Sequence, residues 1–201
     1  MVVVTINYRL SPFGFLFCND TRMPGIAGLF DQSLAFDWVH ENIKYFGGVP
    51  DLITLSGQSI GAMSASLHLF TPLSNRFLKR LVLFSGTLLS YDIHFEAEGL
   101  KQMKQLAIKT KCDNKDSNRV IDCLKKAPIK SILGATVSMI LSAEHLWIPF
   151  IPVNTLYFFP TWLDDLIQRQ SWPRNLALLL STLQDEGIVM NYVIKSPEKE
   201  D

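Results

Sequence analysis

The sequence predicts an α/β fold, with a mostly parallel central sheet and helices on both of its faces. Short apolar runs alternate along the 201 residues with longer segments of helical periodicity. Apolar runs without polar alternation are typical of strands that are buried on both sides, as in a parallel sheet. Strands that alternate with helices favour the same arrangement. We expect residues 1–201 to belong to one domain, because no internal repeat or low-complexity segment divides them.

Four apolar runs are the predicted strands. They cover residues 2–8, 52–55, 80–85 and 176–181. The first run is β-branched, and both it and the last are expected to be buried strands. Ser11-Pro12 ends the first run, and Gly86 closes the third.

The first long helix is predicted between a glycine-rich loop and Gly47-Gly48, which should stop it. Its apolar positions form two neighbouring i, i+4 rows: Phe30, Leu34 and Trp38 in one, and Ala35, Val39 and Ile43 in the other. A second helix should run from Ser59 to about Phe70, where Pro72 follows.

Further helices are predicted in the second half of the chain. They cover 95–110, with Leu100, Met103 and Ala107 on one face, and 117–127. Thr161 and Asp164 resemble a capping box for a short helix that carries Trp162, Leu166 and Ile167. Residues 188–194 are expected to open another helix. The segment 128–160 has several prolines and weak periodicity, so we expect an irregular excursion beside the active site.

The stretch Gly57-Gln58-Ser59-Ile60-Gly61 lies between a predicted strand and a predicted helix. This context favours a nucleophile elbow over a simple glycine- and serine-rich turn. A sharp turn holds the serine hydroxyl exposed, as a nucleophile requires, and the two glycines let neighbouring backbone pass close by. The N–H of Ile60 is expected at the helix N-terminus, where an oxyanion is stabilised.

A second rim residue is expected from the last predicted strand. Glu186 follows the run 176–181, as Ser59 follows the run 52–55. Sites in parallel sheets form outside the carboxyl ends of the strands. We therefore expect Ser59 and Glu186 on the same rim of the sheet.

Composition argues against several classes of partner. Basic and acidic side chains balance at 19 each, so no net charge attracts nucleic acid or an anionic membrane. Apolar residues make up 48% of the chain and charged residues 19%, which is typical of a globular protein. Three polar or proline positions interrupt the longest apolar stretch, 146–159, so no transmembrane segment is expected. Met1 leads directly into a predicted strand, so no signal peptide is expected in this chain.

Two features bear on the cellular compartment. Cys112 and Cys123 flank a polar stretch, and their spacing allows either a disulfide-closed loop or two free thiols. Cys18 would remain as the odd cysteine. Asn19 begins an Asn-Asp-Thr glycosylation sequon in a predicted loop.

Many short blocks of this sequence resemble type-B carboxylesterases, the family that includes the cholinesterases. The blocks are Val3-Val4-Thr5-Ile6-Asn7-Tyr8-Arg9-Leu10, Phe13-Gly14-Phe15-Leu16, Pro24-Gly25 with Gly28-Leu29-Phe30-Asp31-Gln32, Trp38-Val39 with Glu41-Asn42-Ile43, Phe46-Gly47-Gly48, Gly57-Gln58-Ser59-Ile60-Gly61, Phe84-Ser85-Gly86-Thr87, Cys112 with Cys123-Leu124, Phe150-Ile151-Pro152-Val153 and Asp185-Glu186-Gly187. The likeness is strongest before residue 88 and weakens between residues 88 and 148.

The resemblance implies a partial α/β-hydrolase fold and the hydrolysis of carboxylic esters through an acyl-enzyme. It implies a Ser–Glu–His triad with Ser59 as nucleophile and Glu186 as the acid that orients the histidine. It assigns an oxyanion-hole N–H to Ile60 and a disulfide to Cys112 and Cys123. It further implies a small-molecule ester as substrate and a secreted or extracellular protein. We expect no cofactor or metal, and the sequon predicts a glycan at Asn19.

Three departures from the family pattern are expected to matter. The glycine-rich oxyanion segment and the catalytic histidine have no counterpart in this sequence, so we expect a chain truncated at both ends that is inactive alone. The four histidines, His40, His68, His94 and His145, all precede Glu186, and none matches the catalytic position. We expect His40 on a solvated helix face and His68 as a packed or capping residue. Gln58 replaces a glutamate that many relatives carry, which weakens attraction of cationic substrates.

Two other classes of function compete with the esterase. One is a non-catalytic, cholinesterase-like binding or adhesion domain. Such domains usually lose the nucleophile, whereas Ser59 and Glu186 are both present here. The other is an unrelated α/β protein with a chance elbow, which the number of matching blocks disfavours.

Overall fold

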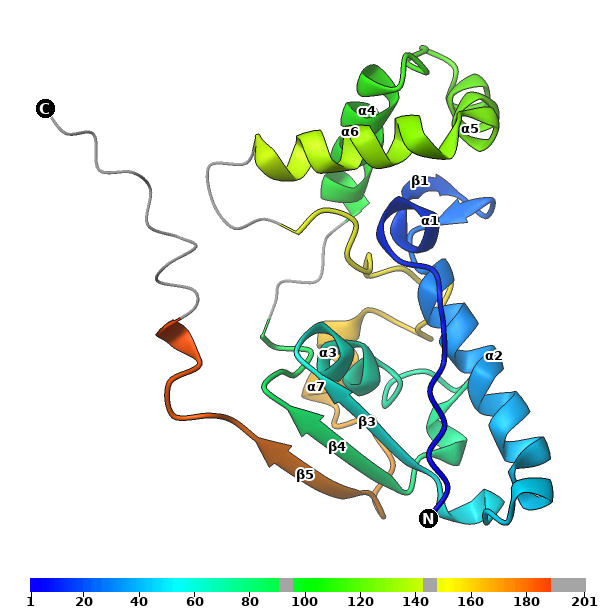
Figure 1. Ribbon diagram of the computed structural model, residues 1–201, viewed down its shortest axis with the longest axis vertical. Helices are drawn as coiled ribbons and strands as arrows, with labels where there is room; N and C mark the ends of the chain where they lie inside the picture. Colours follow the sequence, from blue (N-terminus) through cyan, green and yellow to red (C-terminus); the bar gives the residue numbers. More distant parts are fainter. Residues whose placement is uncertain (91–95, 143–147, 189–201) are drawn as a thin grey trace, which may run out of the picture.

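A computed structural model describes residues 1–90, 96–142 and 148–188 of the chain (Figure 1). Short 3-10 turns at Ile43–Phe46, Pro50–Leu52 and Asn75–Phe77 join some of its elements. The helices are α1 (Ser11–Phe15), α2 (Ala27–Asn42), α3 (Ile60–Leu67), α4 (Glu96–Lys109), α5 (Ser117–Lys126), α6 (Ile129–Leu141) and α7 (Leu163–Gln168). The strands are β1 (Phe17–Asp20), β2 (Met23–Pro24), β3 (Thr54–Gln58), β4 (Arg80–Phe84) and β5 (Ala177–Ser181).

The central sheet has the order β3-β4-β5, and both pairs are parallel. Gln58, Phe84 and Ser181 are register partners at the carboxyl ends of the three strands. Three of the four predicted strands are therefore confirmed, and their ends meet at one rim. The strand before the elbow begins at Thr54, because the proline-led residues Pro50–Leu52 form a 3-10 turn first.

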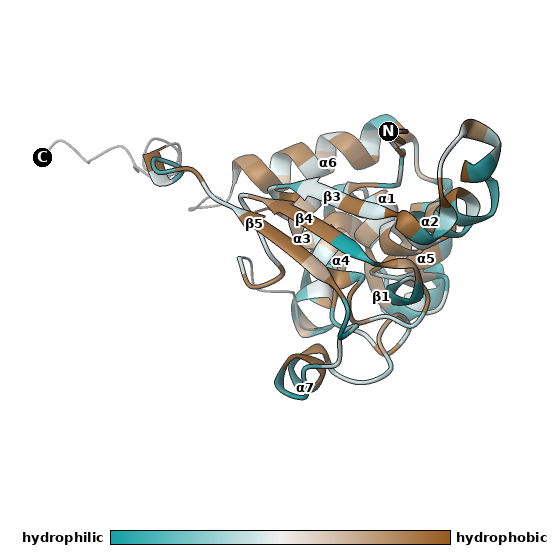
Figure 2. Ribbon diagram, turned by 90° about the horizontal axis from the view of Figure 1, so that it is seen from below, coloured by the Kyte–Doolittle hydropathy of each residue, from teal (hydrophilic) through white to brown (hydrophobic). Residues whose placement is uncertain are grey.

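Helix α3 lies against β3 and β4 and covers one face of the sheet. Leu81 and Leu83 of β4 are buried on this face. The predicted burial of the last strand is wrong, because β5 is an edge strand of the described sheet and Leu178, Leu179 and Leu180 are all at least half exposed. Figure 2 shows β5 as an apolar strand at the sheet edge.

The prediction of a buried strand at residues 2–8 is wrong for the described structure. The three-stranded sheet does not include this segment, and Figure 1 draws it as a trace without a strand arrow. Val2, Val3 and Val4 are exposed. An apolar run is buried on both faces only when neighbouring strands and covering helices surround it, and the described residues supply neither here.

Helix α2 is confirmed, and Gly47 ends the following 3-10 turn with φ 80°. The first predicted row does not form its buried face, since Leu34 is 70% exposed and Trp38 is also exposed, whereas Ile43 of the second row is buried. The residues that are buried are Gly28, Leu29, Gln32, Ser33 and Phe36. Gln32 lies on the buried face because it hydrogen-bonds to side chains of the α3 region, as described below, whereas the buried Ser33 hydroxyl has no hydrogen-bond partner among the described residues.

Helix α4 is confirmed, and of its predicted apolar face Ala107 is buried and Met103 packs against the core. Gly99, Gln102, Leu106 and Ala107 are its buried residues, while the predicted Leu100 is exposed. Gly99 is required by close packing, because a Cβ there would lie 2.9 Å from the Cβ of Phe17. The side-chain oxygen of Gln102 accepts a hydrogen bond of 2.8 Å from the N–H of Phe150. The need for glycine at position 99 and for glutamine at position 102 depends on which distant segments pack against α4.

The structure corrects two further helix predictions. The segment 128–160, predicted to be irregular, contains the helix α6. The capping box at Thr161 is wrong, because Trp162 is the N-cap of α7 and caps it with no side-chain hydrogen bond. The predicted helix over 117–127 is confirmed as α5, and the N-cap Asp116 accepts from the N–H of Asn118. The predicted helix at 188–194 lies outside the described residues beyond Ile188.

The helices α4, α5 and α6 gather at one end of the molecule, and the sheet lies at the other (Figure 1). All three cysteines lie in the described residues. Cys112, just after α4, is bonded to Cys123 in α5, and Cys18 is buried and free. The disulfide that the resemblance implied is therefore present.

We expect the replacement of both Cys112 and Cys123 by serine to lower the free energy of unfolding by roughly 3 kcal/mol, because their disulfide closes a short loop in the unfolded chain. Urea unfolding of the variant and the unsubstituted chain measures the difference. A count of thiols in unfolded, non-reduced protein checks the pairing. One reactive thiol, that of Cys18, is expected, and three would contradict the disulfide.

Candidate active site

Ser59 lies in the turn between the last residue of β3 and the first residue of α3. Its backbone has φ 53° and ψ −122°, a region that non-glycine residues rarely adopt. The turn is fixed on both sides. The N–H of Ser59 donates to the carbonyl oxygen of Phe84 at 2.9 Å, and its own carbonyl accepts from the N–H groups of Ala62 and Met63. Such strain persists only where the surrounding structure imposes it.

The two elbow glycines differ in what they do. A Cβ added to Gly57 would lie 2.2 Å from the carbonyl oxygen of Gly61, so only glycine fits at position 57. A Cβ added to Gly61 would meet nothing within 4 Å. The predicted requirement for close backbone approach therefore applies to Gly57 and is wrong for Gly61.

The residues beside the nucleophile position have the places that the motif predicts. Ile60 is the first residue of α3, so its N–H belongs to the positive end of the helix. Gln58 is the last residue of β3 and is exposed. Among the described residues, the Ser59 hydroxyl makes no capping hydrogen bond to α3. The hydroxyl is thus not committed to closing the helix.

Glu186 lies in the turn after β5, on the rim where Ser59 follows β3. Its Oε1 accepts a hydrogen bond from the hydroxyl of Ser85 and one of 2.6 Å from the N–H of Leu183. The hydrogen bond from Ser85, followed by that from Leu183, lowers the pKa of Glu186. The carboxylate is therefore ionised at neutral pH. The sequence did not single out Ser85 as a partner of Glu186.

His68 is fully buried, as predicted for a packed residue. Its Nδ1 lies 2.7 Å from the Ser74 hydroxyl and its Nε2 lies 2.8 Å from the Gln32 side-chain oxygen. Ser64 donates to the same oxygen at 2.8 Å. An amide oxygen only accepts, so Nε2 carries the proton and Nδ1 accepts from Ser74. Burial lowers the pKa of His68 to about 3, so this histidine is a neutral core residue.

Of the other three histidines, the structure describes only His40, which lies away from the elbow. His40 is half-buried, with its ring centroid 4.7 Å from that of Phe77. The predicted solvated position is therefore wrong, because the 3-10 turn Asn75–Phe77 packs beside α2 there. His94 and His145 lie outside the described residues.

An apolar cavity of about 230 Å³ opens beside the elbow helix. Ile60, Met63 and Leu67 of α3 line one side of it. The lining also includes Phe150, Ile151 and the end of α6, all from the segment that the sequence predicted to lie beside the active site. Sequence patterns did not reveal the cavity, because its wall combines residues from five separate stretches of chain. Its lining suits an uncharged, apolar group.

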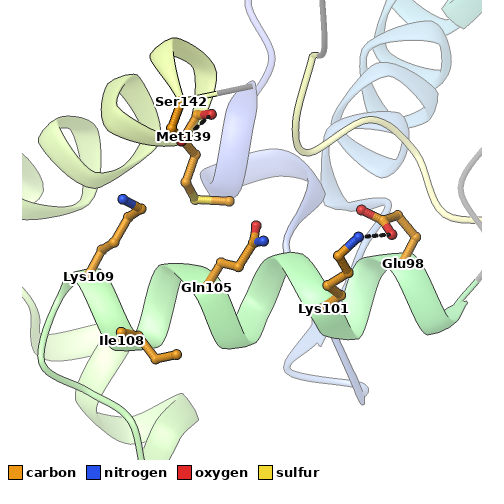
Figure 3. Close-up of a pocket in the computed structure, with 7 residues that line it drawn as sticks. All are labelled: Glu98, Lys101, Gln105, Ile108, Lys109, Met139 and Ser142. Atoms are coloured by element: carbon orange, nitrogen blue, oxygen red, sulfur yellow. Dashed lines mark hydrogen bonds and ion pairs between the residues drawn. The ribbon is translucent and has the colours of Figure 1, made fainter. Parts of the chain in front are cut away.

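A larger hollow of about 390 Å³ lies between α4 and α6 (Figure 3). Its wall carries long charged side chains, including Lys101, which pairs with Glu98, and Lys109, which donates to the Ser138 hydroxyl at 2.8 Å. Neither hollow is lined by Ser59 or Glu186. The apolar cavity is lined by Ile60, the residue that follows Ser59, so we place the candidate active site beside this cavity.

The described ranges also bear on membranes, metals and glycans. Within them, no helix is both long and apolar enough to span a membrane, and no three histidine, cysteine or acidic side chains gather to hold a metal ion. Asn19 is exposed in β1, with φ 51°. It lies in a short ribbon of β1 and β2, whereas the sequence predicted a loop.

The sequence was compared with known protein families and curated proteins. The profile described as "Carboxylesterase family" matches residues 1–201. The acetylcholinesterase of Myxine glutinosa is 35% identical over 189 residues, which are 92% of this chain and 55% of the relative. The bile salt-activated lipase of Bos taurus is 37% identical over 191 residues, 93% of this chain and 31% of the relative. Venom carboxylesterase-6 of Apis mellifera is 38% identical over 157 residues, 78% of this chain and 28% of the relative.

A parallel sheet with a strained serine at a strand-to-helix turn defines a protein of the α/β-hydrolase class. The chain belongs to the carboxylesterase family. It spans between 28% and 55% of the length of the curated relatives that it matches.

Proposed function

We propose that the whole protein hydrolyses carboxylic esters with Ser59 as the nucleophile and Glu186 as the orienting acid. The observation that carries this proposal is the strained turn at Ser59, with φ 53° and ψ −122°, between β3 and α3. Glu186, ionised and held by two hydrogen bonds on the same rim, supports it. A binding or adhesion domain would have no need of this strain at the serine.

The reaction would proceed in two steps through an acyl-enzyme. The Ser59 Oγ attacks the ester carbonyl carbon and gives its proton to a histidine of the whole protein, which passes it to the departing alkoxide. The alcohol leaves, and an acyl group remains on Ser59. Water then attacks the acyl carbon and gives a proton to the same histidine, the bond between Oγ and the acyl carbon breaks as the histidine passes that proton to Oγ, and the carboxylic acid leaves. Glu186 stabilises the imidazolium, and the N–H of Ile60 donates to the oxyanion in both steps.

The apolar cavity beside α3 supports an ester with an uncharged acyl or alcohol group. Its wall near the elbow is formed by Ile60, Met63 and Leu67. The neutral Gln58 at the end of β3 supplies no carboxylate for a cationic substrate. The names of the relatives include acetylcholinesterase, esterase and lipase. Among the esters that these names suggest, we favour uncharged ones as substrates of this protein.

We also propose that the protein is secreted or faces the extracellular space. The disulfide between Cys112 and Cys123 is typical of oxidising compartments. Asn19 is exposed at its sequon, where a glycan would meet no buried surface.

The proposal is tested with a longer chain of this protein, one that covers the full length of its relatives. Such a chain should hydrolyse a short-chain aryl ester, and Ser59→Ala should lower its rate on the order of 10⁶-fold, because the nucleophile is lost. Ser56→Ala is the matched control, since Ser56 is an exposed serine of the same strand and should leave the rate unchanged. Residues 1–201 alone should show negligible turnover without the base.

Two results would contradict the proposal. A longer chain that hydrolyses the ester equally well with and without the Ser59 hydroxyl would exclude Ser59 as nucleophile. A longer, folded chain without any turnover would favour the binding domain. Turnover by residues 1–201 that disappears in Ser59→Ala would keep Ser59 as nucleophile and would show that one of the four histidines in this chain acts as the base.

A further inference from the structure

The outer face of α6 carries a row of exposed apolar side chains, which we call the α6 stripe. Its members are Ile129, Leu133, Val137 and Ile140. Residues three and four apart lie on one face of a helix, so these four side chains form one continuous row. Each is at least 44% exposed. The helix is held in the protein by a different face, which buries Ile132, Ala135, Thr136 and Met139.

The α6 stripe has no cover within residues 1–90, 96–142 and 148–188. Through its buried face, α6 packs against α4 and α1. A Cβ added to Gly134, the neighbour of Leu133, would meet nothing within 4 Å. Figure 2 shows α6 as a largely apolar helix at one margin of the molecule. A continuous exposed apolar row of this kind marks a surface that binds a partner.

Three lysines lie at the end of α6 where the stripe begins. Lys125 and Lys126 are in the last turn of α5, and Lys130 is in the first turn of α6. All three are exposed, and none pairs with an acid in the part of the chain that the structure describes. Residues 125–141 contain no acidic side chain. The balanced charge of the whole chain therefore conceals a basic site beside an apolar row.

The acids of α5 and of the residue before it do not neutralise this site. Asp122 lies 3.6 Å from Arg22, and Asp116 lies 3.8 Å from Arg119, measured between the charged groups. Both carboxylates thus have an arginine as counter-ion. The positive charge of the three lysines is left for a partner outside these residues.

The other end of the stripe reaches the apolar cavity beside the elbow. Ile140 belongs to the stripe and also lines this cavity. Leu10 and Ile60 line the same cavity, and both are exposed. A partner seated on the stripe would therefore lie next to the cavity that we assign to the candidate active site.

We propose that the α6 stripe and the lysines Lys125, Lys126 and Lys130 dock the protein on a lipid bilayer with anionic headgroups. The apolar side chains enter the boundary between headgroups and acyl chains, and the lysines bind the headgroups. A second copy of this chain fits less well, because a two-fold interface over the stripe would gather the same unpaired lysines from both copies. The docking goes beyond ester hydrolysis and does not depend on it.

Vesicle binding by the longer chain tests this proposal. The Ser59→Ala variant is used, so that no ester bond of the lipid is cut during the measurement. It should sediment with vesicles of phosphatidylcholine and phosphatidylserine in equal parts, and added salt should weaken the binding because it screens the lysines. Binding to phosphatidylcholine alone should be weaker. A chain that does not sediment with the anionic vesicles would overturn the proposal.

The contribution of the stripe is measured with Leu133→Gln and Val137→Gln together. Both side chains are about half exposed, and the changes should lower the affinity for the anionic vesicles roughly 10-fold or more, because less apolar surface enters the lipid. Leu34→Gln with Leu52→Gln is the matched control, since it removes two exposed leucines elsewhere and should leave the affinity unchanged. An equal loss in both pairs would contradict docking through α6.

The contribution of the lysines has a control of equal charge. Replacement of Lys125, Lys126 and Lys130 by glutamine should weaken the binding roughly 100-fold, because each lysine at an anionic surface contributes about fivefold. Replacement of Lys44, Lys79 and Arg174 by glutamine removes the same net charge from exposed positions elsewhere. This control should bind almost as well as the unsubstituted chain. Equal weakening would show attraction by net charge alone and would refute the site.

A fluorescent label decides the question if the multiple variants do not fold. An environment-sensitive dye on Val137→Cys should shift to shorter wavelength when anionic vesicles are added, and a dye on Leu34→Cys should not. Absence of the shift at position 137 would overturn the proposal. A dimer without vesicles that dissociates in Leu133→Gln with Val137→Gln, and that does not bind lipid, would assign the stripe to a second copy instead.

These results are separable from the proposed function. An active longer chain that ignores the vesicles would reject only the docking surface. An inactive longer chain that binds the vesicles through α6 would reject ester hydrolysis and keep the docking surface.

Discussion

Replacement of Gly57 by alanine is expected to lower the free energy of unfolding by at least about 3 kcal/mol. The new Cβ would lie 2.2 Å from the carbonyl oxygen of Gly61 and 2.6 Å from the N of Ala62. Both contacts are with backbone, so neither is relieved by rotation of a side chain. The first turn of α3 must move away from β3, or the variant does not fold. Urea unfolding followed by circular dichroism measures the change.

Gly61→Ala is the matched control for this prediction. Gly61 is in the first turn of α3, and a Cβ there meets nothing within 4 Å. Alanine in a helix is up to about 1 kcal/mol more favourable than glycine, so this variant should be unchanged or slightly more stable. Equal destabilisation by the two substitutions would show that the elbow does not have the close approach described above.

The second large effect is a loss of stability in mild acid that originates at His68. The pKa of His68 is about 3 in the folded protein because of burial, against an ordinary value of 6.5. Between these values the unfolded chain binds a proton that the folded protein does not, so the free energy of unfolding falls as the pH falls. The stabilisation is complete above pH 6.5, and about 2 kcal/mol of it should be lost between pH 7 and pH 5.

The pH range separates His68 from the carboxylates whose pKa values are also lowered. Asp20, Asp31 and Glu186 have ordinary values of 3.8 to 4.5, so their contributions are lost mainly below pH 5. His68→Gln should be less stable at pH 7, because the buried network with Gln32 and Ser74 is disturbed, and it should lose the slope between pH 7 and pH 5. His40→Gln serves as the control and should keep the slope. A slope that persists in His68→Gln would refute this origin.

Local signals in the sequence correctly predicted the elements whose conformation depends on neighbouring residues. The elbow at Ser59 was predicted from five consecutive residues and their flanking runs, the strand β4 from a short apolar run, and the helix α5 from its own segment. The place of Glu186 on the rim followed from the parallel order of the strands. Short contiguous segments determine these features, because φ/ψ preferences, glycines and helix caps act over a few residues.

By itself, the sequence determined the class of fold, the strained turn at Ser59 and the rim shared with Glu186. The tertiary structure alone decided which face of α2 is buried, that β5 is exposed, and that Gly57 but not Gly61 requires glycine. It also decided that Ser85 holds Glu186 across 101 residues of sequence. The physical reason is that burial, close backbone approach and side-chain hydrogen bonds depend on which distant segments meet, and a pattern along one segment does not specify its neighbours in space.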